Sequence, residues 1–194
     1  MVIFVASSCG GGDGEMSLTE YVERVDAILS RGLQRYEALV ASPQGEVLVA
    51  EAVRLADFTP QDLQVALERL GDIQAEALEA AFTIEPPEDM VDLHTLFFRR
   101  LPIEELAARA GTAADWEELS GSPEMVVYRA LLVEDEQVCA EFQAKLDATA
   151  ERGVFADTPW IPGELKEIVE YALGCGSLLE NPEDLYRPPP STTP

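Results

Sequence analysis

Apolar residues recur at alternating steps of three and four along most of the chain, which restricts it to packed helices. The clearest stretch follows Ser17 and places its apolar side chains on one stripe: Leu18, Tyr21, Val22, Val25, Ile28, Leu29, Leu33, Tyr36, Leu39 and Val40. This spacing has the period of an α-helix, and such a stripe must be buried against another element. Because no stretch predicts a strand with comparable strength, we expect an all-α fold.

Capping residues and prolines divide the pattern into long helices, expected near residues 17–41, 60–84, 88–110 and 123–151. Ser17 with Glu20 predicts a capping box, and Thr59 and Ser122 are each an N-cap followed by proline. Pro102 should break or kink the third helix, because proline lacks the N–H donor. Shorter helices are expected near residues 47–57 and 112–119 and after Pro162, although residues 47–49 would also suit a strand. The predicted fold is an irregular helical bundle of long antiparallel helices plus short helices.

Composition separates the two ends of the chain from its middle. With 194 residues the chain can bury one sizeable core, which we place in a single helical-bundle domain, residues 17–180. Residues 181–194 are rich in proline and are expected to form an extended tail that packs little. Residues 1–16 precede the first apolar stripe and contain a glycine-rich stretch that predicts a flexible tether.

Cys9 follows a short apolar run and small residues and directly precedes Gly10, an order typical of a bacterial lipidation site. We interpret residues 1–16 as a truncated signal remnant with its lipidation site and tether, the alternative being a disordered leader. No later stretch approaches the roughly 18 continuous apolar residues of a membrane-spanning helix. The expected location is therefore extracytoplasmic, with membrane attachment only through a lipid anchor at Cys9.

If Cys9 carries lipid, Cys139 and Cys175 remain, and an even remainder in an oxidising compartment predicts a disulfide between them. Cys139 is expected inside the helix near 123–151, and Cys175 just beyond the last short helix. The alternative is two unpaired thiols buried in a cytosolic helical protein.

The chain carries 37 acidic and 13 basic residues, a net charge of −24. Its mean surface potential repels phosphate backbones, so nucleic-acid binding is excluded. The same charge could attract metal cations or basic peptides, although such a charge is more often simply a solvated acidic surface.

His94, Trp116 and Trp160 are the candidate ligand-contact residues. His94 is the only histidine, and Asp92 and Glu88 could tune it as a metal ligand or general base. The alternative is a structural histidine whose ring nitrogens bond a neighbouring helix or turn. A single histidine excludes the two-histidine zinc and diiron sites, so no metal, cofactor or catalytic residue is predicted. The tryptophans could line a groove or seal the ends of the bundle.

Ile84, Glu85, Pro86 and Pro87, followed by the Leu93-His94 pair, form a pattern similar to that of helical bacterial extracytoplasmic lipoproteins of unknown function. The resemblance covers residues 17–111 and implies two long helices joined at a Pro-Pro turn, without implying an activity.

The expected function is a non-catalytic cell-envelope lipoprotein that acts as a helical binding or interaction module for an unknown envelope protein or small ligand. Two alternatives stay open. One is a cation- or basic-peptide-binding protein, and the other is a hydrolase or thiol enzyme centred on His94 and Cys139.

Overall fold

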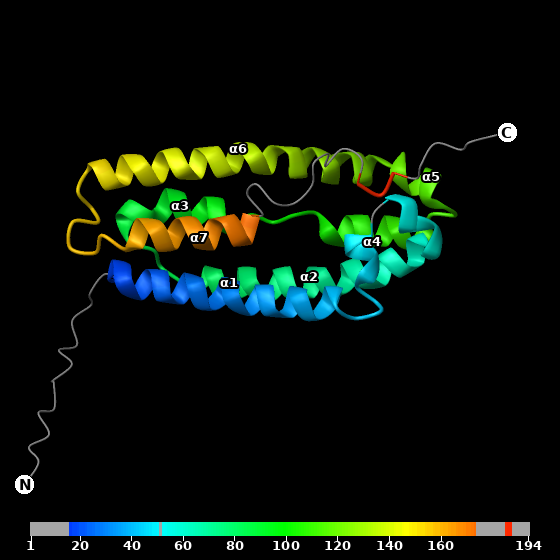
Figure 1. Cartoon of the computed structure of the whole chain (residues 1–194), viewed down its shortest axis with the longest axis horizontal. Helices are drawn as coiled ribbons and strands as arrows, with labels where there is room; N and C mark the ends of the chain where they lie inside the picture. Colours follow the sequence, from blue (N-terminus) through cyan, green and yellow to red (C-terminus); the bar gives the residue numbers. More distant parts are fainter. Residues whose placement is uncertain (1–15, 51, 174–184, 188–194) are drawn as a thin grey trace, which may run out of the picture.

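The computed structural model describes residues 16–50, 52–173 and 185–187, and in these residues it is all-α (Figure 1). The α-helices are α1 (Leu18–Val40), α2 (Pro60–Phe82), α3 (Val91–Phe97), α4 (Ile103–Thr112), α5 (Trp116–Ser120), α6 (Pro123–Glu151) and α7 (Ile161–Leu173). Three short 3-10 helices are η1 (Glu46–Val49), η2 (Ala52–Asp57) and η3 (Glu88–Met90). Figure 1 shows an elongated bundle with α6 along one side, α1 and α2 along the other, and α3, α4 and α7 between them. The predicted irregular helical bundle is confirmed.

The long helices begin where their capping residues predict. The Ser17 hydroxyl accepts a hydrogen bond from the N–H of Glu20 (3.2 Å), but the Glu20 carboxylate bonds an arginine one turn later and leaves the box incomplete. A complete capping box forms instead at α2, where Thr59 and Asp62 each satisfy the other's backbone N–H. Ser122 caps α6 in the same way as Ser17 caps α1. Each side chain therefore satisfies a donor that has no partner within the helix.

The turn after α1 requires a glycine. A Cβ atom on Gly45 would lie 2.0 Å from the carbonyl oxygen of Leu39, so any larger residue would force the backbone apart. The chain then continues as η1 and η2, which bury Val47 and Leu55. The stretch predicted as one short buried helix is thus two 3-10 segments, and neither is a strand.

The helix expected near residues 88–110 is not continuous, which corrects the prediction. It begins as η3, continues as α3, and ends at Phe98, where the backbone leaves the helical region (φ −108°, ψ 55°). Pro102 has no N–H to donate to the carbonyl of Phe98 four residues earlier, and its ring would collide with that carbonyl. The proline also disfavours helical geometry at Leu101. Residues 98–102 therefore form a non-helical linker before α4 begins.

The linker (residues 98–102) is tied to both sides of the bundle. Arg99 forms an ion pair with Asp135 of α6 and donates to the carbonyl of Leu131 (2.9 Å). On the other side, the Gln74 amide of α2 bonds the backbone of Leu101 through both of its polar atoms (3.0 and 3.2 Å). Burial raises the pKa of Asp135, and the Arg99 guanidinium opposes that rise. Asp135 is thus half-buried and not part of a fully solvated acidic face.

The described core consists of two clusters, whereas the sequence predicted one. The first joins the start of α1 to α3, the far end of α6 and α7: Tyr21, Val22, Val25, Ile84, Met90, Leu93, Phe142, Leu146, Phe155, Ile161 and Leu165. The second joins η1, η2, α2, α4, α5 and the start of α6: Val47, Leu55, Leu63, Ala66, Leu67, Ile103, Leu106, Ala107, Ala110, Ala113, Leu119, Met125, Tyr128 and Tyr186. The break at the linker produces this division, because α3 packs in the first cluster and α4 in the second.

Part of the predicted C-terminal tail packs against the bundle, although the sequence predicted that it would not. Within residues 185–187 the Tyr186 side chain is only 5% exposed and belongs to the second cluster. Burying an aromatic ring offsets the entropy of ordering a few residues of chain. The prediction that residues 181–194 pack little is therefore wrong at this point.

Two aliphatic side chains on α6 test the division between core and surface. Leu146 is 1% exposed, and we expect Leu146→Ala to lower the unfolding free energy by about 2–5 kcal/mol through lost burial and a residual cavity. Val127 on the same helix is 52% exposed, and Val127→Ala should change it by less than about 0.5 kcal/mol. Urea unfolding followed by circular dichroism measures both, and equal losses would contradict this assignment of the core.

Candidate functional site

His94 lies on α3, and its ring forms hydrogen bonds with two neighbouring helices. Its Nδ1 is 3.1 Å from the hydroxyl of Tyr21 in α1, and a backbone hydrogen bond links the ring to Ala81 in α2. Phe98 packs against the ring at a centroid distance of 4.9 Å. These contacts fit a neutral imidazole that accepts from the Tyr21 hydroxyl and donates to the Ala81 carbonyl. Such contacts are those expected of the structural role that the sequence left open beside the functional one.

Burial lowers the pKa of His94, and the hydrogen bond to Ala81 opposes this only in part. Asp92, one of the two carboxylates expected to tune the ring, pairs with a cation elsewhere. Asp92 lies on the surface, 3.3 Å from the ammonium of Lys145. The ring contacts that the structure describes are those with Tyr21, Ala81 and Phe98.

The two tryptophans lie apart from this ring. The Trp116 indole N–H donates to the carbonyl of Phe58 (3.0 Å), and its ring packs on the second cluster. Trp160 is 48% exposed just before α7. The candidate ligand-contact residues therefore do not converge on one site.

A groove that the sequence did not predict lies between α2 and the linker, and we call it the α2 groove. It encloses about 430 Å³ and is lined by Gly71, Gln74, Ala75, Leu78, Glu79, Phe82, Phe98, Arg100, Leu101, Ile103 and Glu104. In Figure 1 the linker crosses between α3 and α4. Because the linker is not helical, its side chains and those of α2 form the two walls.

The α2 groove combines an apolar lining with an acidic rim. Phe82 is 79% exposed, the highest exposure among the large apolar side chains described. Arg100 is paired with Glu104 (3.0 Å), which leaves the exposed carboxylate of Glu79 as excess negative charge. One feature of the sequence could have indicated this groove, because Phe82 falls outside the apolar stripe of its helix. Phe82 is not isolated, because Leu78 and Leu101 line the same groove, and a contiguous exposed apolar patch is a candidate binding surface.

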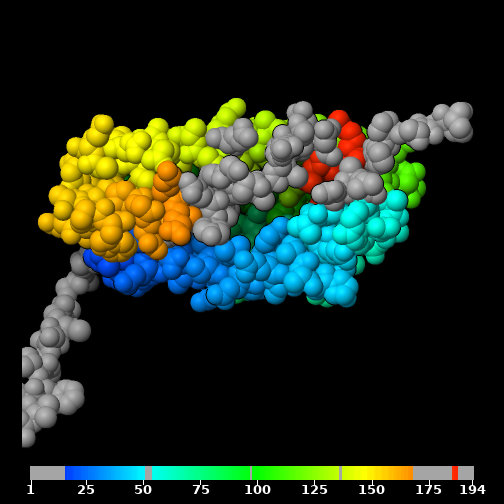
Figure 2. Space-filling view, viewed as in Figure 1, coloured from blue at the N-terminus to red at the C-terminus, as the bar shows by residue number. Residues whose placement is uncertain are grey.

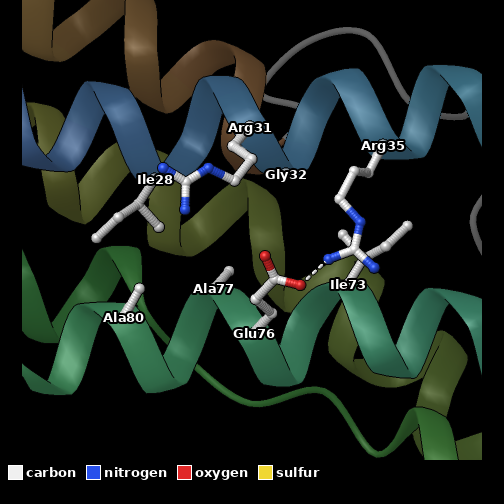
Figure 3. Close-up of a pocket in the computed structure, with 8 residues that line it drawn as sticks. All are labelled: Ile28, Arg31, Gly32, Arg35, Ile73, Glu76, Ala77 and Ala80. Atoms are coloured by element: carbon white, nitrogen blue, oxygen red, sulfur yellow. Dashed lines mark hydrogen bonds and ion pairs between the residues drawn. The ribbon is translucent and has the colours of Figure 1, made fainter.

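A second hollow between α1 and α2 does not form a usable site. Figure 3 shows Arg35 reaching from α1 to Glu76 of α2, with which it pairs across the hollow, while the Arg31 guanidinium lies on the side of Ile28. The enclosed space is about 10 Å³, which accommodates no more than one water molecule. The ion pair of Arg35 with Glu76 therefore joins α1 to α2.

No group of three or more His, Cys, Asp or Glu side chains among the described residues is placed to hold a metal ion. None of the helices in the described ranges is both long enough and apolar enough to cross a membrane.

Comparison with known proteins identifies no relative. No protein-family model matches the chain, and no curated protein or solved structure matches it significantly. The resemblance carried by Pro86, Pro87 and the Leu93-His94 pair therefore stays an expectation.

The lowered pKa of His94 predicts how stability changes with pH. The unfolded chain, with a histidine pKa near 6.5, takes up a proton before the folded protein does as pH falls. The contribution of His94 to the unfolding free energy is thus fully present above pH 6.5 and is lost as pH falls through 6.5 toward the lower folded pKa. We expect His94→Gln, which keeps one acceptor and one donor, to show a shallower decline in urea unfolding between about pH 7.5 and 5. Identical slopes for the two proteins would exclude this contribution.

Proposed function

We propose that this protein is a non-catalytic interaction module that docks a basic amphipathic helix of a partner protein in the α2 groove. The observation that carries the proposal is the exposed Phe82 ring at the mouth of an apolar groove with an acidic rim. Burying exposed apolar surface is the main driving force of such association.

The form of the groove favours a helix over a small molecule. Small-ligand sites bury most of the ligand surface, whereas Phe82 at 79% exposure stands open to solvent. One wall of the groove is α2 itself, along which Leu78 and Phe82 are spaced by one turn. An amphipathic helix presents apolar side chains at the same spacing, as in known helix-in-groove recognition.

Charge complementarity favours a basic partner. The net charge of −24 steers cations toward the surface and repels acidic segments. Glu79 and Glu104 line the groove itself, and Arg100 is already paired with Glu104. A basic residue flanking the apolar face of a docked helix could therefore pair with Glu79.

The test uses a Leu/Lys peptide of about 15 residues with one apolar face, labelled for fluorescence anisotropy. We expect Phe82→Ser to weaken its binding by about tenfold or more, as for a central apolar anchor. The matched control is Val65→Ser, which removes another exposed apolar side chain of α2 outside the groove and should leave binding unchanged.

Charge alone could retain a basic peptide on so acidic a protein, and the two variants separate this case. Equal binding by the Phe82→Ser protein, the Val65→Ser protein and the parent would show nonspecific attraction and would refute docking in the groove. A peptide with Glu in place of every Lys should not bind.

We further propose that the module is an extracytoplasmic lipoprotein, anchored through Cys9 to the bacterial cell membrane. Cys9 and Cys175 lie outside the described residues, so the lipid site and the disulfide stay predictions. What supports the disulfide is that α6, which carries Cys139, packs against α7, whose last residue Leu173 is two positions before Cys175.

The disulfide is tested by peptide mapping of exported protein without reduction, which should recover Cys139 and Cys175 in one linked pair. The bond would close a loop of about 36 residues, so Cys139→Ser should lower the unfolding free energy by up to about 4 kcal/mol. Cys9→Ser serves as the control and should not change the unfolding free energy. Recovery of both cysteines as alkylated free thiols would contradict the prediction.

A further inference from the structure

Arg129 of α6 holds the backbone of the C-terminal segment. Its side chain is nearly buried, and its Nε donates to the carbonyl of Leu185 (2.8 Å). The same guanidinium donates to the carbonyl and to the hydroxyl of Ser120, both at 2.9 Å. One planar group therefore joins the end of α5 to residue 185 with directed hydrogen bonds.

Tyr186 occupies the space beside this guanidinium. Its ring stacks on Trp116 with a centroid distance of 6.0 Å and an interplanar angle of 17°, and its hydroxyl donates to the carbonyl of Leu48 (3.4 Å). Figure 2 shows residues 185–187 in red at the surface, between the yellow-green start of α6 and the cyan segment of η1 and η2. The segment thus crosses from α6 to the opposite side of the second cluster.

We propose that Trp116, Arg129 and the Leu48 carbonyl form a peptide-binding slot that recognises a short segment through one backbone carbonyl and the aromatic residue after it. The chain's own residues 185–186 fill this slot. Peptide recognition commonly combines hydrogen bonds to the peptide backbone, which give affinity, with a pocket for a side chain, which gives specificity. Here Arg129 would supply the backbone hydrogen bond, and the space beside Trp116 would accept the aromatic ring.

The slot is held in place by bonds that do not involve its occupant. The Trp116 indole is fixed by its hydrogen bond to Phe58, and Arg129 by its two bonds to Ser120. Such preorganisation lowers the entropy lost when a ligand enters.

The occupant is held at a cost to its own backbone. Tyr186 has a φ of 54°, in the left-handed region that residues with a Cβ rarely adopt. This backbone cost opposes the contacts that hold the segment in the slot.

The experiment uses the full chain with Trp160→Phe, which leaves Trp116 as its single tryptophan. In this background Tyr186→Ala empties the ring position, and Trp116 emission should shift to longer wavelength. A synthetic peptide of residues 183–189 should then reverse the shift with saturation, whereas the same peptide with Tyr186→Ala should not. The Trp160→Phe protein with its own Tyr186 should need at least a tenfold higher concentration of the first peptide.

Two results would overturn the proposal. A helical Tyr186→Ala protein that does not respond to the peptide would show that Tyr186 is ordinary core packing. A Tyr186→Ala protein that fails to fold, as judged by circular dichroism, would show that the slot depends on its occupant and is not preformed.

Discussion

The missing N–H of Pro102 shapes this molecule more than any other single group. It cannot bond the carbonyl of Phe98, and the clash of its ring with that carbonyl ends the helix four residues before the proline. The chain then crosses to the other half of the bundle, so α3 and α4 bury their side chains in different clusters. The same break brings Phe98, Leu101 and Ile103 beside α2 as one wall of the α2 groove. The division of the core and the α2 groove therefore share one cause.

The long helix α6 holds the two clusters together. Met125 and Tyr128 lie in the second cluster, and Phe142 and Leu146 lie in the first. Between them, Asp135 pairs with Arg99 of the linker instead of contributing to either cluster. A half-buried ion pair adds little net stability, because desolvation offsets the attraction, but its geometry fixes where the linker meets α6.

Local signals in the sequence predicted the helices well and their partners poorly. Thr59 and Ser122 mark helix starts because a side-chain oxygen and a following proline act within one turn, independently of the rest of the fold. Which helix α2 packs against depends instead on how far the chain travels after Phe98, and no local spacing specifies that distance. Hence α4, and not a continuous helix, is the main partner of α2.

The α2 groove was not predicted from the sequence, for a related reason. His94 attracted attention as a rare residue type, yet its ring is engaged by Tyr21 and Ala81, which are distant in sequence. Phe82 carries no chemical signature, and only its place off the buried stripe distinguishes it. The burial of Tyr186 was not predicted, because a proline-rich composition predicts poor packing on average and does not indicate where a single aromatic ring packs.

The placement of its few cations explains how so acidic a chain can bring its helices together. Several of its basic side chains join one element to another: Arg35 to Glu76, Arg99 to Asp135, Arg109 to Glu118, Lys145 to Asp92 and Arg152 to Asp89. Exposed pairs of this kind contribute little individually, but they relieve like-charge repulsion where acidic helices meet. Cations placed at these contacts cannot also neutralise the open surface. At the α2 groove Arg100 pairs with Glu104, so the surplus negative charge is that of Glu79, and the partner that we propose would supply the cation to pair with it.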